Sequence, residues 1–292
     1  MTTQSPDNND HGGTTYRGRK VALLTQHGKE QVIAPVLEAY LGCHVRRVSG
    51  YDTDRLGTFT REIPRAGTQL EAARKKGRIG MELSGLSLGL ASEGSFGPDP
   101  ITGLLPWNLE LLIWIDENLG IEVAGYASGQ TNFSHRLTAS WDEAKQFARD
   151  AGFPGHWLVV RPEGEEHPHI RKGIAGWDEL EKEFRWASDR ASDGRVFLET
   201  DMRAHANPTR MEMIASAARD LAQKLCTRCP ACGTPGFSAA ERIPGLPCED
   251  CGAPTMETRA EAHRCVRCGH QLIVEINEPK TASAARCDYC NP

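Results

Sequence analysis

The sequence predicts an α/β protein with a mixed sheet and a small cysteine-rich module at its C-terminus. Through residues 17–225, short apolar segments typical of buried strands mix irregularly with segments of helical periodicity, which favours a mixed sheet over an all-parallel one. Four Cys-x-x-Cys pairs then follow within residues 229–290. We therefore expect a disordered segment over residues 1–16, an α/β domain over residues 17–225 and a double zinc ribbon over residues 226–292.

The first half of the α/β region predicts three strands and two helices. An apolar strand over residues 20–25 precedes a helix with apolar spacing over residues 32–41, whose start is limited by Pro35. The remaining elements, in chain order, are a strand over 44–48, a helix over 68–81 and a small apolar strand over 86–91 that leads into Ser92-Glu93-Gly94-Ser95.

The second half predicts a strand pair followed by helices and strands in turn. Residues 109–115 and 121–127 are apolar and are joined by a turn at residues 117–120. Asn207 and Pro208 are a typical N-cap and first helical residue for a long helix ending near Leu225. Between the strand pair and this long helix we expect helices over 141–151 and 177–188 and strands over 157–161 and 195–199.

The composition is typical of a soluble globular protein. Hydrophobic residues make up 39% of the chain and charged residues 25%, and no apolar run is long enough for a membrane span. The N-terminus lacks the pattern of an export signal, so we expect a cytoplasmic location, where paired cysteines favour metal over disulfides. The net charge is −5, and residues 226–292 hold seven Lys/Arg against eight Asp/Glu, so nucleic-acid binding is not expected.

The cysteine pairs predict two structural zinc ions, each held by four thiolates. The pairs are Cys229/Cys232, Cys248/Cys251, Cys265/Cys268 and Cys287/Cys290. Fifteen residues separate the first two pairs and 18 the last two, so sequential pairing fits the spacings best, and an interleaved arrangement stays open. Cys226, at the end of an apolar helical segment, is interpreted as a spare thiol.

Three segments carry candidate catalytic or binding residues. Thr25, His27 and Lys29 lie at a strand-to-helix junction, where backbone N–H groups and the helix dipole favour an anion, although such junctions often only cap a helix. Glu71 and Lys76 lie on the 68–81 helix, whose simpler interpretation is a solvated face. Glu93, expected at a strand end before glycine, could hold a metal or orient a water, or be an exposed turn acid.

The order of these segments resembles the inosine/xanthosine triphosphate pyrophosphatase and Maf-like families. TQHGK at residues 25–29 resembles their opening T-x-N-x-x-K motif, TQLEAARKKG at 68–77 their helix motif, and LGLASEGS at 88–95 their strand ending in acidic residues. The resemblance implies an ITPase/Maf-like fold and Mg²⁺-dependent hydrolysis of nucleoside triphosphates to monophosphate and pyrophosphate. It implies phosphate binding by Thr25, His27, Lys29, Lys76 and Arg210, catalysis by Glu93 and Glu71, and magnesium binding by Glu71, Glu93 and Glu62.

Departures from the motif keep a second class of function open. Leu70, Ala72 and Ser92 stand where those families have two acids and an asparagine, which favours a protein that binds a nucleotide or phosphate ligand without cleaving it. In this alternative the zinc module would contact a protein or, less expected from its charge, a nucleic-acid partner, and a homodimer stays open. The whole chain also resembles an uncharacterised bacterial family that is known only as a domain of unknown function.

Overall fold

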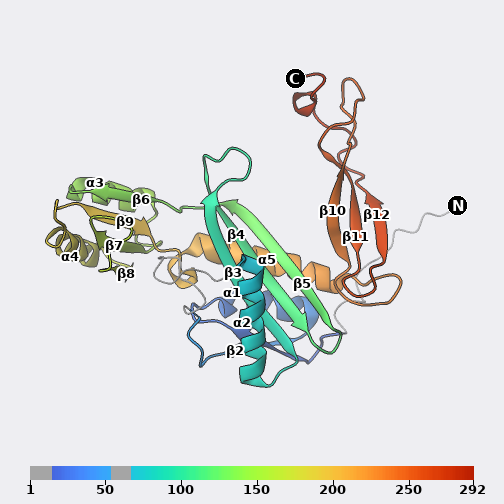
Figure 1. The fold of residues 1–292 in the computed structure, drawn as a ribbon, viewed down its shortest axis with the longest axis horizontal. Helices are drawn as coiled ribbons and strands as arrows, with labels where there is room; N and C mark the ends of the chain where they lie inside the picture. The colour runs from blue at the N-terminus through green and yellow to red at the C-terminus, as the bar shows by residue number, and fades with distance from the viewer. Residues whose placement is uncertain (1–14, 54–66) are drawn as a thin grey trace.

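The computed structural model describes residues 15–53 and 67–292, which form a body of two sheets and a projecting C-terminal tail (Figure 1). The larger sheet has the order β2-β1-β3-β4-β5. Strand β1 (Lys20–Leu24) is parallel to both β2 (His44–Val48) and β3 (Leu88–Pro98). Strands β4 (Pro106–Asp116) and β5 (Ile121–Gln130) continue the sheet in antiparallel pairing, so the sheet is mixed, as predicted.

Helices cover both faces of this sheet because its strands are apolar on both sides. Helices α1 (Glu30–Leu41) and α5 (Pro208–Cys226) pack on one face, where Trp114 is fully buried. Helix α2 (Gln69–Ser84) packs on the other face. At Gly125 of β5, an added Cβ would lie 2.5 Å from the Cβ of Leu221, so glycine permits the close approach of α5.

The smaller sheet forms a second lobe that is inserted in the chain between β5 and α5. Its strands are antiparallel in the order β6-β9-β7-β8, and helices α3 and α4 bury Phe147 and Phe184 against it. In chain order the elements are β6 (His135–Thr138), α3 (Trp141–Asp150), β7 (Leu158–Pro162), β8 (Arg171–Ile174), α4 (Trp177–Ser188) and β9 (Val196–Thr200). A short 3₁₀ helix, η2 (Ala204–Ala206), leads back to α5.

The tail is a three-stranded antiparallel sheet that begins directly after α5. Its order is β10 (Ser238–Pro244), β11 (Thr258–Arg264) and β12 (Gln271–Glu275), and a 3₁₀ helix, η3 (Ala284–Arg286), follows. The loop before β10 contacts the body, because the Gly236 N–H donates to the Lys224 carbonyl of α5. The remainder of the tail projects from the body (Figure 1).

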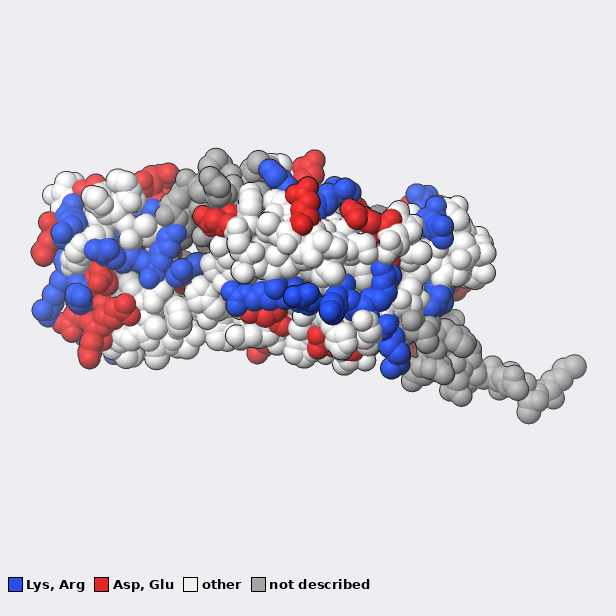
Figure 2. All heavy atoms as spheres, turned by 90° about the horizontal axis from the view of Figure 1, so that it is seen from below, with Lys and Arg blue, Asp and Glu red and all other residues white. Residues whose placement is uncertain are grey.

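The molecular surface carries both signs of charge. Figure 2 shows a row of Lys and Arg side chains across the middle of one face, with Asp and Glu side chains gathered beside it. No helix among the described residues is long and apolar enough to cross a membrane.

Three details differ from the sequence prediction. Pro35 lies inside α1, which begins at Glu30, so proline does not mark the start of this helix. Strand β3 continues to Pro98, which places Glu93 in the middle of a strand rather than before a glycine-rich turn. Strands β6 and β8 were not predicted, because each is only four residues long and has a single buried residue.

Candidate functional site: a buried cluster of charges and two cysteine clusters

The eight paired cysteines form two groups of four at opposite ends of the tail sheet. In each group the four sulfur atoms all lie within 4.8 Å of one another, and the closest approaches are 3.6–3.9 Å. Four thiolates at 2.3 Å from a tetrahedral zinc ion would be separated by about 3.8 Å. Both groups could therefore hold zinc ions.

Sequential pairing of the cysteines, our prediction from the spacings, is wrong. The first group is Cys229, Cys232, Cys265 and Cys268, and the second is Cys248, Cys251, Cys287 and Cys290. The cause is the antiparallel course of the chain: β10 carries it from the first cysteine pair to the far end, and β11 brings it back to the third. Cys226 lies outside both groups, with its sulfur 3.9 Å from the Tyr40 carbonyl.

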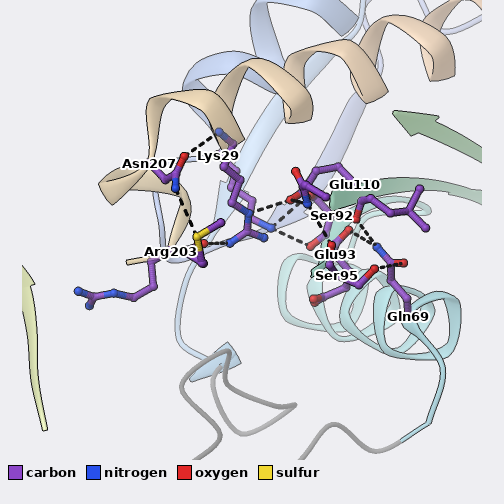
Figure 3. A network of polar contacts seen from close by, with 12 residues as sticks. Lys29, Gln69, Ser92, Glu93, Ser95, Glu110, Arg203 and Asn207 are labelled. Atoms are coloured by element: carbon purple, nitrogen blue, oxygen red, sulfur yellow. Dashed lines mark hydrogen bonds and ion pairs between the residues drawn. The ribbon is translucent and has the colours of Figure 1, made fainter. Parts of the chain in front are cut away.

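A buried cluster of charged side chains in the body lies where β1 ends and β3 continues. The pairing of β1 with β3 reaches Leu90, so Ser92 lies just beyond the carboxyl end of β1. The Lys29 ammonium, at the start of α1, donates to the Ser92 carbonyl and hydroxyl oxygens, both at 3.2 Å (Figure 3). The Lys76 ammonium of α2 reaches the same carbonyl at 3.5 Å and forms an ion pair of 2.8 Å with Glu93.

A second buried ion pair adjoins these lysines. Arg210 Nε lies 2.8 Å from Glu110 Oε1, and both side chains are about 1% exposed or less. Asn108 donates to the same Glu110 oxygen at 3.2 Å, and the Arg210 guanidinium also donates to the Met202 carbonyl and lies 5.3 Å from the centre of the Phe96 ring. The Asn207 side chain caps α5 by accepting from the Arg210 backbone N–H, which places Arg210 in the first turn of this helix.

Cations outnumber carboxylates in the contacts described for this cluster. Lys29, Lys76 and Arg210 face the two carboxylates Glu93 and Glu110. Burial lowers the pKa of Lys29 from its ordinary value to about 7, and the Arg210 and Lys76 charges act in the same direction, against Glu110 and Glu93. A bound anion would compensate this excess of positive charge.

The structure brings together some of the predicted residues and separates others. Lys29, Lys76, Glu93 and Arg210 meet in the cluster. Thr25 is buried directly after β1, and the His27 ring centre lies 5.1 Å from that of His205.

Glu71 has a different role from the one predicted. It is exposed, and its Oε2 accepts from the Thr68 N–H at 2.7 Å and from the Thr68 hydroxyl at 2.9 Å in a capping box at the start of α2. These hydrogen bonds lower its pKa. The motif T-x-x-E is itself the signature of a capping box, and we interpreted it as part of a site instead. Glu62 lies outside the described residues.

Three polar residues in or beside the cluster were not predicted from the sequence. Asn108 and Glu110 are buried on the α5 face of β4 and alternate with apolar neighbours. Polar residues at the buried positions of a strand pattern were the signal that could have identified them. Gln69 was also missed: its side-chain amide donates to the Glu93 carbonyl at 2.8 Å and to the Leu109 carbonyl at 3.0 Å.

A family model covering most of the chain matches residues 76–292. The chain belongs to the family described as Domain of unknown function (DUF6671). Neither the curated proteins nor the solved structures contain a match to the chain. The DUF6671 match includes Lys76, Glu93, Arg210 and both cysteine groups, whereas Lys29 precedes it. The family description carries no activity, so the function has to be argued from the residues.

The residues of the buried charged cluster suit magnesium less well than the tail cysteines suit zinc. Among the described residues, the groups that gather three or more metal-ligating side chains are the two cysteine groups. In the cluster, Glu93 is paired with Lys76 and Glu110 with Arg210. The predicted magnesium site of Glu62, Glu71 and Glu93 is therefore not supported as a set of protein ligands.

Proposed function

We propose that the body of this protein binds a nucleoside triphosphate and hydrolyses it to the monophosphate and pyrophosphate. The observation that carries the proposal is the buried cluster in which Lys29, Lys76 and Arg210 meet the two carboxylates Glu93 and Glu110 among the described residues. A buried ammonium with a pKa of about 7 is poorly compensated, and a polyphosphate supplies the missing negative charge.

Aromatic side chains on the α5 side of this cluster suit the other part of a nucleotide. The His205 ring centre lies 5.1 Å from that of His27 and 5.4 Å from that of Trp157. Phe96, under the Arg210 guanidinium, lies 5.9 Å from Phe133. Nucleobases stack on such rings without a requirement for one base. We therefore propose a nucleotide rather than inorganic phosphate as the ligand.

Glu93 is the proposed base for the hydrolysis. Its carboxylate would accept a proton from a water that attacks the α-phosphorus, and the bond from that phosphorus to the bridging oxygen would break, releasing pyrophosphate. Lys29 and Arg210 would stabilise the negative charge on the phosphate oxygens. Any Mg²⁺ bound to the incoming triphosphate would neutralise phosphate charge, and no protein carboxylate is assigned to it.

A non-catalytic nucleotide-binding protein is the second candidate. The observation that favours it is the engagement of both carboxylates, Glu93 by Lys76 at 2.8 Å and Glu110 by Arg210 at 2.8 Å. A carboxylate already held by a cation is a weaker base and a weaker metal ligand than an open one. In this case the same cations would bind the phosphates, and no bond would be cleaved.

The Glu93→Gln substitution separates the two candidates. The amide keeps the size of the side chain but cannot accept the proton, so we expect pyrophosphate release from nucleoside triphosphates with Mg²⁺ to fall about 100-fold or more. The matched control is Glu122→Gln, which removes a carboxylate paired with Arg74 on the surface at 2.7 Å. Thermal unfolding of each variant shows whether the fold is retained.

Three outcomes of this comparison are informative. Full activity in Glu93→Gln would overturn the proposed base. An inactive wild type that binds nucleotide would favour the binding protein. Absence of both activity and binding across a panel of bases would reject both candidates.

The low pKa of Lys29 predicts that nucleotide binding is linked to proton uptake. Above pH 7 the Lys29 amine of the free protein is largely neutral, and an anion beside it raises its pKa, so binding takes up a proton. We expect affinity to fall by up to about tenfold per pH unit above pH 8. Calorimetry with an α,β-methylene triphosphate, in buffers of different ionisation enthalpy, measures this uptake directly.

Lys29→Arg is the matched control for this linkage. Its guanidinium stays charged throughout the range, so the variant should bind without taking up a proton at this position. Equal proton uptake by wild type and variant would contradict the assignment to Lys29.

A further inference from the structure

The free edge of the tail sheet is apolar and exposed. In the part of the chain that the structure describes, strand β12 (Gln271–Glu275) pairs with β11 on one side and forms the edge of the sheet on the other. Leu272 is 48% exposed, Ile273 61% and Val274 41%, so apolar side chains lie exposed on both faces of one strand. The edge lies on the side of the tail away from the body (Figure 1). An edge of this kind is a template for pairing with another strand.

The opposite edge of the same sheet has features that block such pairing. Strand β10 contains two register shifts against β11, between Ala239 and Glu241 and between Ile243 and Pro244. It also carries the charged pair Glu241-Arg242 and ends in a proline, which has no N–H to donate. Strand β12 has neither a register shift nor a proline. The contrast indicates that β12 is the edge suited to pairing.

The hydrogen bonds to β11 identify the backbone groups that point outwards. The His270 carbonyl accepts from the Cys265 N–H, and the Ile276 N–H donates to the Arg259 carbonyl. Because the direction alternates along an antiparallel strand, the even-numbered residues from 270 to 276 face β11. Gln271, Ile273 and Glu275 therefore present their N–H and C=O groups to the open edge.

We propose that two copies of this chain pair through β12 about a two-fold axis at Ile273. Antiparallel pairing in this register sets Ile273 opposite itself and Gln271 opposite the partner's Glu275, and all three outward-facing residues of each strand form hydrogen-bonded pairs. Leu272 then lies opposite the partner's Val274 on the other face. The exposed apolar side chains are thus buried against each other on both faces.

Charge complementarity favours this register over pairing about Glu275. On β11, Arg264 lies opposite Gln271 of β12, and Ala260 lies opposite Glu275. Within one chain, the β11 residue opposite the Glu275 carboxylate is therefore uncharged. Pairing about Ile273 places each Glu275 beside the partner's Gln271, in line with its Arg264. Pairing about Glu275 would instead set the two carboxylates opposite each other, which is destabilising.

The size of the interface predicts a weak dimer. Five residues on each side bury less than the roughly 1,200 Å² of a standard stable interface, so dimerisation should depend on concentration. The proposal is tested with the full-length zinc-loaded protein by sedimentation equilibrium from about 5 to 300 µM. We expect the wild type to change from monomer to dimer within this range, and a strictly monomeric wild type would overturn the proposal.

Ile273→Lys tests the surface. It sets two ammonium groups opposite each other at the two-fold axis, so the dissociation constant should rise at least tenfold. The control is Leu83→Lys at the end of α2, where the leucine is similarly exposed at 51%. An unchanged dissociation constant in Ile273→Lys, or an equal rise in both variants, would overturn the assignment to β12.

Gln271→Glu tests the register. This change sets the introduced carboxylate opposite the partner's Glu275 and should weaken the dimer several-fold. Adding Glu275→Lys converts each like-charge pair into an ion pair and should restore dimerisation to at least the wild-type level. If the double variant were no tighter than Gln271→Glu alone, pairing about Ile273 would be wrong.

Discussion

Replacing Arg210 by methionine is expected to lower the free energy of unfolding by about 3–5 kcal/mol, because it leaves the Glu110 carboxylate buried without its cation. Both side chains are almost completely buried, and the ion pair joins α5 to β4 at 2.8 Å. Glu110 Oε2 is buried and has no hydrogen-bond partner in the described structure, and once Arg210 is lost Oε1 keeps only the hydrogen bond from Asn108 at 3.2 Å among those described. Chemical denaturation monitored by near-ultraviolet circular dichroism measures the loss.

The matched control is Arg74→Met. Arg74 pairs with Glu122 at 2.7 Å, but the two side chains are 36% and 28% exposed, and solvent screens such pairs. We expect this substitution to cost less than about 1 kcal/mol. Equal effects of the two substitutions would show that burial does not determine the value of the Arg210 pair.

A double substitution distinguishes stability from function at the same position. Arg210→Met with Glu110→Leu removes both charges and should recover much of the stability lost in Arg210→Met alone, as replacement of other buried ion pairs by apolar residues does. It would not recover phosphate binding, because the cation is absent. Recovery of nucleotide affinity together with stability would therefore argue against a role for Arg210 in binding.

The sequence predicted the helices and central strands well because local patterns determine them. Residues 177–188 have helical spacing and form α4 with those bounds, and Asn207-Pro208 starts α5 as expected. Apolar strand segments that are buried on both faces, as β1 is, were equally clear. Their order gave the mixed α/β class, whereas the ITPase/Maf-like fold stays a prediction.

The site was harder to predict because its residues depend on pairings distant in sequence. Lys29 contacts Ser92 across 63 residues and Arg210 contacts Glu110 across 100. Ser92 was interpreted as a lost acid, although its carbonyl and hydroxyl are the acceptors for Lys29. Nothing local in the sequence shows that β1 stops short of β3 and leaves these oxygens open to lysine.

The cysteine groups show the same limit in a simpler form. Spacing identified all eight candidate ligands but not the partition between the two sites, because each Cys-x-x-Cys pair can serve either ion. The partition follows from the strands between the pairs. Three antiparallel strands return the third pair to the first and leave the second pair to meet the fourth.

The number of zinc ions that a double cysteine variant retains should depend on how the cysteines are divided between the two groups. Cys232→Ser with Cys268→Ser damages one group alone, so the protein should keep about one zinc ion per chain. Cys232→Ser with Cys251→Ser damages both groups and should leave none tightly bound. The three cysteines are exposed, so their replacement removes a ligand without disturbing core packing. Metal analysis after dialysis against a weak chelator provides the count.

Sequential pairing would reverse these two results, which makes the comparison decisive. In that arrangement Cys232 and Cys251 would share one ion, and the second double variant would be the one to keep zinc. The damaged group should also lose its local fold, because a module with so small an apolar core depends on the free energy of zinc binding to fold. The Cys232/Cys268 variant should therefore lose order near Phe237, which packs between Cys229 and Cys265, while the far group stays protected from hydrogen exchange. Loss of both ions from both double variants would mean that the two groups fold as one unit, and that the strands between them transmit the damage.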